Sequence, residues 1–191
     1  MKALVLCGSP RQNGNTQQTL ELLCATLKEK SVDAELVLVH GKTIKPCVAC
    51  EHCKELKDRT CAIKDDDFQP IFDKLLAADA FIVGSPVYFG CATSQTTSFL
   101  HRAGYVSRAN GMLLGGKVGA PVAVARRAGH NFTYAQLMFF FTINDMIVPG
   151  STYWNVAIGR KKGEVMQDAE GLDTIKHFAA NVADLLGKLG K

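Results

Sequence analysis

The sequence predicts one α/β domain built on a doubly wound parallel sheet. Three observations support this fold class. Short apolar runs alternate along the chain with stretches of helical periodicity, five such runs are separated by helices, and the first run ends in a Gly-Ser-Pro turn. A length of 191 residues fits a single domain with a substantial core. Ligands of such sheets bind at the carboxyl ends of the strands, where the strand order reverses.

The first elements follow from apolar spacing. Residues 2–7 form a short apolar run, as expected of a buried parallel strand. Residues 16–30 carry leucines three and four positions apart and predict a helix, and residues 34–39 predict the second strand. Residues 41–64 have neither period and hold most of the cysteines, so we expect a cysteine-rich insertion there.

The remaining elements continue the alternation. Three aspartates and an early proline predict that a helix begins at about residue 65 and runs to 78, with the carboxylates at its cap. Residues 80–84 predict the third strand. The later elements are expected as a helix over 93–106, a strand over 117–125 after a glycine-rich connector, a helix over 130–144, a fifth strand made of 146–148 and 153–156 and broken by Pro149-Gly150, and a terminal helix over 169–189.

The segment from Gly8 to Thr16 is suited to an anion. It joins a buried strand to a helix N-terminus, which offers free N–H groups and the positive end of a dipole. Short polar side chains and one arginine add donors, and the glycine spacing matches neither a dinucleotide fingerprint nor a Walker loop. A mononucleotide phosphate fits best, and the alternative is a polar turn capped by Asn15 or Thr16. The candidate phosphate-binding side chains are Ser9, Arg11, Asn13, Asn15 and Thr16.

Four cysteines within fifteen residues predict an inorganic centre. Cys47, Cys50 and Cys53 are spaced by two residues each, and Cys61 follows after seven. Compact spacing lets four thiolates converge, each on one iron of an iron–sulfur cube. Zinc bound by the four cysteines, or with a histidine in place of one, and four free thiols remain alternatives. Seven cysteines also point to a reducing compartment, and we expect the cytoplasm.

Together these motifs resemble a known superfamily. The segment Gly8 to Thr16, followed by Ser85-Pro86-Val87-Tyr88-Phe89-Gly90 after the third strand, resembles the flavodoxin-like NAD(P)H-dependent FMN reductases. With the four cysteines the chain is similar to the iron–sulfur flavoprotein branch. The resemblance implies a five-stranded sheet of order 2-1-3-4-5, FMN phosphate at residues 9–16, and a 4Fe–4S cluster on Cys47, Cys50, Cys53 and Cys61. It also implies that the flavin ring is lined by Pro86, Val87, Tyr88, Phe89 and Gly90, with a further contact at Ala128 and Gly129.

These expectations define a function and its rivals. The leading hypothesis is an oxidoreductase that transfers electrons between FMN and the cluster, with NAD(P)H as a possible co-substrate and no catalytic side chain. The alternatives are a cluster-free NAD(P)H-dependent FMN or quinone reductase and a non-enzymatic FMN electron carrier. The resemblance implies a nicotinamide or a ferredoxin-like protein as redox partner, and a homodimer or homotetramer. A net charge of +4 and the lack of a long apolar run argue against nucleic-acid and membrane partners.

Overall fold

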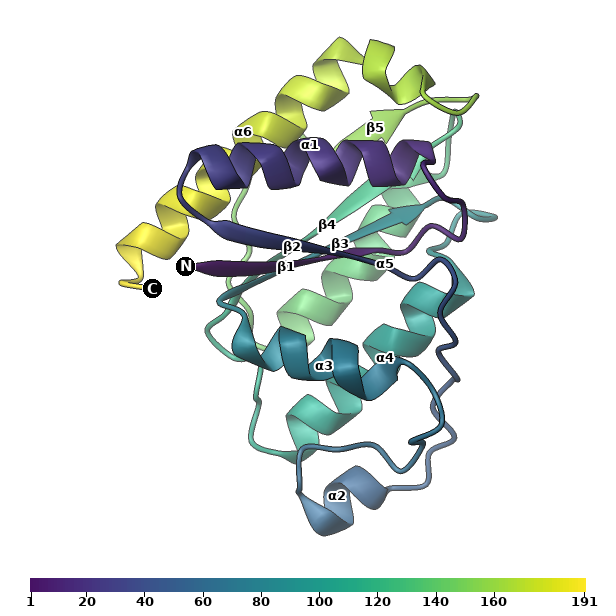
Figure 1. Ribbon diagram of the computed structural model, residues 1–191, viewed down its shortest axis with the longest axis vertical. Helices are drawn as coiled ribbons and strands as arrows, with labels where there is room; N and C mark the ends of the chain where they lie inside the picture. Colours follow the sequence, from purple (N-terminus) through teal and green to yellow (C-terminus); the bar gives the residue numbers. More distant parts are fainter.

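The computed structural model describes residues 1–191 and contains a five-stranded parallel sheet between two layers of helices (Figure 1). Helices α1 and α6 cover one face of the sheet, and α3, α4 and α5 cover the other. The strands are β1 (Lys2–Cys7), β2 (Asp33–Leu38), β3 (Ala80–Pro86), β4 (Val118–Ala125) and β5 (Val156–Ile158). The helices are α1 (Asn15–Glu29), α2 (His52–Leu56), α3 (Phe68–Ala77), α4 (Ser94–Ala109), α5 (His130–Ile143), the 3₁₀ turn η1 (Glu164–Gln167) and α6 (Ala169–Lys188).

The strand order is β2-β1-β3-β4-β5, which confirms the predicted order. Each strand alternates its side chains between the two faces, so the core divides into two clusters. In β1, for example, Val5 packs under α1 and α6, whereas Leu4 and Leu6 pack against the other helical layer. All four strand pairs are parallel, so the carboxyl ends of the five strands lie at the same edge of the sheet, where ligands of this fold class bind.

The predicted fifth strand was wrong in its position. Ile147 makes only an isolated bridge to Val118, and the regular strand forms later, at Val156–Ile158. The reason lies in β4, because Pro121 has no N–H to donate and interrupts pairing on that side. The Asn155 side-chain amide donates to the Pro121 carbonyl at 3.2 Å, and the ladder resumes two residues further on, at Ala123.

Two further differences concern the middle of the chain. The cysteine-rich segment contains one short helix, α2, and β3 extends to Pro86, two residues beyond the predicted strand. In Figure 1 the segment with α2 lies at one end of the long axis, beyond α3 and α4. The two chain termini lie near each other at the opposite edge from the carboxyl ends of the strands. None of the helices has the length and apolar character needed to cross a bilayer.

Candidate functional site

A cleft of about 270 Å³ lies at the carboxyl ends of β1, β3, β4 and β5, and we call it the strand-end cleft. It is formed by the turn before α1, the loop after β3, the end of β4 and the loop after β5. Seven of the predicted cofactor-binding residues line it: Ser9, Arg11, Asn15, Thr16, Pro86, Val87 and Tyr88.

The turn before α1 is held by hydrogen bonds to β3 and to the residue before α4. The Gly8 N–H donates to the Gly84 carbonyl at 2.7 Å, and its own carbonyl accepts from the Thr93 hydroxyl at 2.7 Å. The Ser9 hydroxyl accepts from the Arg11 N–H at 3.1 Å. No side chain caps α1, so the amides of its first turn remain available to an anion.

The two asparagines of this turn have structural partners. The Asn15 amide donates to the carbonyls of Gly159 and Lys161 and accepts from the Gly163 N–H, all within 2.9 Å. It therefore ties the loop after β5 to the start of α1. Asn13, in the left-handed region at φ 53°, pairs with Gln17 through its N–H and its side chain, and it does not line the cleft.

The loop after β3 is a two-residue hairpin. Tyr88 and Cys91 exchange both backbone hydrogen bonds, and the central residues Phe89 and Gly90 have φ of 53° and 81°, as a type I′ turn requires. This turn directs Phe89 away from the cleft, since its side chain is fully exposed. Gly129 packs behind the hairpin, where an added Cβ would lie 2.9 Å from Val87 Cγ1. Among the predicted ring contacts, Phe89, Gly90, Ala128 and Gly129 thus lie outside the cleft lining.

The charge of the cleft is uniformly positive. Arg11 is joined by Arg126, Arg160 and Lys162, and no aspartate or glutamate lines the cleft. Arg126 follows β4 directly, at the carboxyl end of that strand. Arg160 and Lys162 were missed because the fifth strand was predicted too early in the sequence. With β5 at Val156–Ile158, these two residues lie in the loop at its carboxyl end.

The four predicted metal ligands also share one site. Cys47, Cys50, Cys53 and Cys61 line a single pocket of about 90 Å³, which we call the cysteine pocket. It is a third of the volume of the strand-end cleft, a size suited to an inorganic centre and not to a nucleotide. The two sites have no lining residue in common.

The donor set of the cysteine pocket is sulfur from four cysteines. An iron–sulfur cube takes one thiolate at each iron, and a zinc site takes its four ligands at one point. The chemistry of the donors fits either group, and no three His, Cys, Asp or Glu side chains converge on one point.

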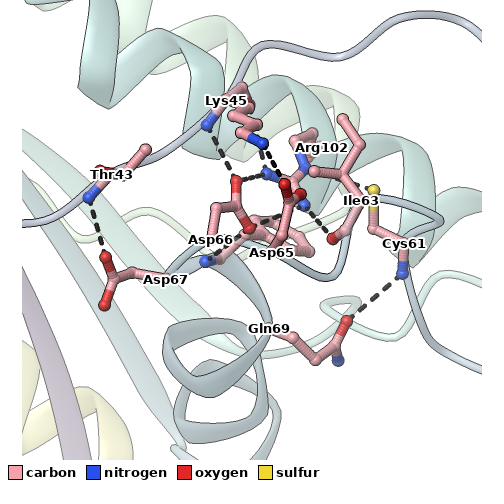
Figure 2. Close-up of polar contacts among 10 residues, drawn as sticks. Thr43, Lys45, Cys61, Ile63, Asp65, Asp66, Asp67, Gln69 and Arg102 are labelled. Atoms are coloured by element: carbon pink, nitrogen blue, oxygen red, sulfur yellow. Dashed lines mark hydrogen bonds and ion pairs between the residues drawn. The ribbon is translucent and has the colours of Figure 1, made fainter.

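Three consecutive aspartates anchor the cysteine-rich segment (Figure 2). Asp67 accepts from the Thr43 N–H at 2.8 Å, Asp66 accepts from the Lys45 N–H at 2.9 Å, and Asp65 pairs with the Lys45 ammonium. The three carboxylates were predicted to cap α3, but they bond mainly to the cysteine-rich segment. The Asp67 side chain accepts no hydrogen bond from the first turn of α3, and only Asp66 accepts from an N–H there, that of Phe68.

Arg102 is a buried charged residue beside the cysteine pocket that the sequence patterns did not single out. It lies on α4 with an exposed fraction of 1%, and its guanidinium pairs with Asp66, whose side chain is also fully buried. Burial raises the pKa of Asp66, but hydrogen bonds from Arg102, Lys45 and Phe68 outweigh it and hold that pKa below its ordinary value. The signal was present, because the spacing of Phe99, Arg102 and Val106 places a charge on the apolar face of the helix.

The thiols differ in their surroundings. Burial raises the pKa of Cys53, and the neighbouring cysteines raise it further. The lysines near the cysteines are paired with carboxylates, Lys45 with Asp65 and Lys54 with Glu51. The buried cation beside the cysteine pocket is Arg102 instead.

Comparison with known proteins identifies the family. The sequence pattern of the NADPH-dependent FMN reductases matches residues 1–161. An iron–sulfur flavoprotein of Methanocaldococcus jannaschii is 33% identical over 198 residues, with both chains covered completely. One of Methanosarcina thermophila is 30% identical, with coverage of 100% of this chain and 98% of that one. The chain belongs to the NADPH-dependent FMN reductase family, in its iron–sulfur flavoprotein branch. Membership of this family makes it an FMN-binding redox protein.

Solved structures agree on the fold. RosB with a bound flavin intermediate superposes with a TM-score of 0.81 at 18% identity, covering this whole chain and 80% of the other. A WrbA-like flavodoxin from Agrobacterium tumefaciens gives 0.68 at 16% identity, covering 98% and 97%. At such low identity these likenesses concern the flavodoxin-like fold alone.

Proposed function

We propose that this chain binds FMN in the strand-end cleft and a 4Fe–4S cluster in the cysteine pocket, and that it transfers electrons between them. The observation that carries the proposal is the pairing of two sites in one chain. One is a cationic cleft at an uncapped helix N-terminus, and the other is a pocket ringed by four cysteines.

The residues of the cleft divide between the two ends of FMN. The amides of the first turn of α1, the buried Thr16 and the Arg11 guanidinium hold the phosphate dianion. Pro86, Val87 and the Tyr88 ring provide apolar walls for the flavin. The basic residues that remain around the cleft, Arg126, Arg160 and Lys162, attract a second anionic partner, such as a nicotinamide dinucleotide or an acidic ferredoxin-like protein.

Cys47, Cys50, Cys53 and Cys61 would each supply one thiolate to the cluster. Bound flavin supplies exchange of one or two electrons, and a bound cluster supplies exchange of one. The chain's own part is to hold the two centres, keep their ligands in place and set their electrostatic surroundings. Because such thiolates must stay reduced, we place the protein in the cytoplasm.

The proposal includes self-association as a homodimer or homotetramer. A groove of about 690 Å³ runs between α4 and α5, and it meets the cysteine pocket at Lys54 and Tyr105. Its lining includes Phe139 and Ile143, which are 71% and 58% exposed. A second copy on this α4–α5 groove would bury that apolar surface. Phe139→Asp should yield a monomer in size-exclusion chromatography, and Phe132→Asp, exposed but outside the groove, should leave the assembly unchanged.

FMN binding is tested at the phosphate end of the cleft. Arg11→Ala and Thr16→Ala should each raise the Kd for FMN at least tenfold, about 1.4 kcal/mol. Arg127→Ala is the matched control, because Arg127 is an exposed arginine that does not line the cleft. Unchanged affinity in both cleft variants would move the phosphate elsewhere.

The cluster is tested by anaerobic analysis of iron and sulfide. We expect about four of each per chain after reconstitution, since four thiolates serve one cube. FMN without iron or sulfide would favour the cluster-free reductase. If the protein oxidises no NAD(P)H, whether it holds FMN with a cluster or FMN alone, the result would favour an electron carrier.

A further inference from the structure

Arg102 uses its whole guanidinium group in the interior of the protein. Its two terminal nitrogens pair with Asp66 and also donate to the Lys45 carbonyl at 3.2 Å and the Ile63 carbonyl at 2.9 Å. Its Cζ atom lies over the Phe68 ring, 4.0 Å from the ring centroid. The remaining donor, Nε–H, points at the Cys61 sulfur at 3.3 Å (Figure 2).

This last contact is not needed to bury the charge. Asp66 already neutralises the guanidinium, and the two carbonyls complete its other hydrogen bonds. A neutral thiol is a weak acceptor, whereas a thiolate gains a charge-assisted hydrogen bond from an arginine. Of the four cysteines around the cysteine pocket, Cys61 alone receives a side-chain hydrogen bond. Its backbone is also fixed, because its N–H donates to Gln69 Oε1 at 3.3 Å.

We propose that Arg102 is a positioning residue for the cluster: its Nε–H holds the Cys61 thiolate in place and raises the reduction potential of the cluster. This inference rests on the proposed function. In the transfer, the flavin gives up one electron and the thiolate-bound cluster gains it, so that the cluster becomes more negative by one charge. A hydrogen bond to a ligand sulfur stabilises the more negative state.

The geometry also assigns roles to the neighbours of Arg102. Asp66 fixes the guanidinium in two directions through a bidentate pair, and Phe68 stacks beneath it. The direction of Nε–H is therefore set by Asp66 and Phe68 at the start of α3, together with the Lys45 and Ile63 carbonyls of the cysteine-rich segment. One fixed ligand out of four makes Cys61 the rigid corner of the site.

The test is Arg102→Lys, because lysine keeps a positive charge near Asp66 but lacks the planar fork that serves four acceptors at once. The control is Arg127→Lys, an exposed arginine that lines neither the cysteine pocket nor the strand-end cleft. The cluster potential is measured by an EPR-monitored redox titration, with the flavin potential in the same sample as an internal reference. We expect the Arg102→Lys cluster to be tenfold harder to reduce, about 59 mV lower for one electron, with the flavin and the control unchanged.

The outcomes separate this role from the proposed function. A wild-type protein that binds FMN but takes up neither iron nor sulfide overturns the cluster and this role together. If wild type binds its cluster and the cluster potential of Arg102→Lys is unchanged, the role of Arg102 alone is overturned. An equal shift of the cluster and flavin potentials in Arg102→Lys also overturns it. If Arg102→Lys retains no iron, the pair Arg102→Gln and Arg102→Met decides, because both lose the charge and only glutamine keeps an N–H at the place of Nε along the side chain. More iron per chain in Arg102→Gln than in Arg102→Met supports the role, and equal iron in the two overturns it.

Discussion

Gly8 offers the sharpest test of how the fold supports the strand-end cleft. A Cβ at this position would lie 1.9 Å from the Thr96 hydroxyl oxygen and 3.1 Å from the Gly84 carbonyl oxygen. Thr96 is fully buried, and its hydroxyl shares a hydrogen bond of 2.8 Å with that of Thr93, which in turn donates to the Gly8 carbonyl. Gly8→Ala therefore forces the Thr96 side chain out of this network.

The cost has two parts. Breaking a buried hydrogen bond and leaving a hydroxyl unpaired costs about 1–3 kcal/mol. Inserting a methyl group into a close-packed site costs about 1–3 kcal/mol more. We therefore expect Gly8→Ala to lower the free energy of unfolding by about 3 kcal/mol, and Thr96→Ala to lower it by about 1 kcal/mol. With the Thr96 hydroxyl removed, the new methyl meets no atom closer than 3.1 Å, so Gly8→Ala should then cost much less.

A double-mutant cycle measures this difference by urea unfolding of the FMN-free protein. The expected coupling between the two sites is about 2 kcal/mol, well above the ~0.5 kcal/mol found for independent sites. Additive effects would refute the reasoning, because they would mean that the Gly8 methyl is accommodated without displacing Thr96. An unchanged urea dependence of the free energy keeps the comparison within two states.

Three further results follow from particular contacts. The pKa of Asp66 is lowered, so its ion pair adds stability above its ordinary pKa of 3.8, and that stability is lost as the pH falls through the pKa of the folded state. Asp66→Asn should therefore be less stable than wild type at pH 6, and urea titrations should show a smaller difference in unfolding free energy between the two proteins at pH 3. Burial raises the pKa of Cys7 to about 11 and that of Cys24 to about 12, so iodoacetamide at pH 8 followed by mass spectrometry should label the exposed Cys91 well before either; equal rates would contradict the burial. Gly159→Ala should weaken FMN binding measured by fluorescence, because its Cβ would lie 2.6 Å from the Asn15 amide nitrogen, whereas Gly150→Ala, with open space around it, should have no effect.

Local patterns were enough to predict the sheet. Each strand is a short apolar run beside a helical stretch, and the parallel order follows from the family that the two loop motifs indicate. The phosphate turn and the four cysteines were also readable, because each motif is contiguous and its chemistry depends on its own residues. In each case sequence neighbours are also spatial neighbours.

The errors arose where distant segments meet. The position of β5 depends on Pro121 in another strand, which lies 35 residues before Val156. Arg102 was visible as a charge on an apolar helical face, but its partners Asp66 and Cys61 lie 36 and 41 residues away. Asn15 lines the strand-end cleft, as its motif predicted, but the motif did not show that its side chain also binds the backbone 144 residues further on. Such pairings follow from tertiary structure and have no signature in one sequence.

The cysteine-rich segment shows why its shape depends on the rest of the fold. Four of its residues that are not glycine, Ala49, Glu51, Lys57 and Arg59, have φ between 51° and 64°. A left-handed conformation costs such a residue about 1–2 kcal/mol, so contacts outside the segment have to offset this strain.

Those contacts come from α3, α4 and the residues that flank them. The Arg59 N–H donates to Asn110 Oδ1 at 3.0 Å, the Cys61 N–H donates to Gln69, and Arg102 holds the Ile63 carbonyl. All of these hydrogen bonds join the segment to other parts of the chain and involve no bound group. The helices therefore hold the end of the segment that carries Cys61 in a strained course, whether or not a cluster is bound. Cys47, Cys50 and Cys53 lie between Lys45 and Arg59, on a stretch that makes no hydrogen bond to these helices, so the helices hold Cys61 more directly than the other three cysteines.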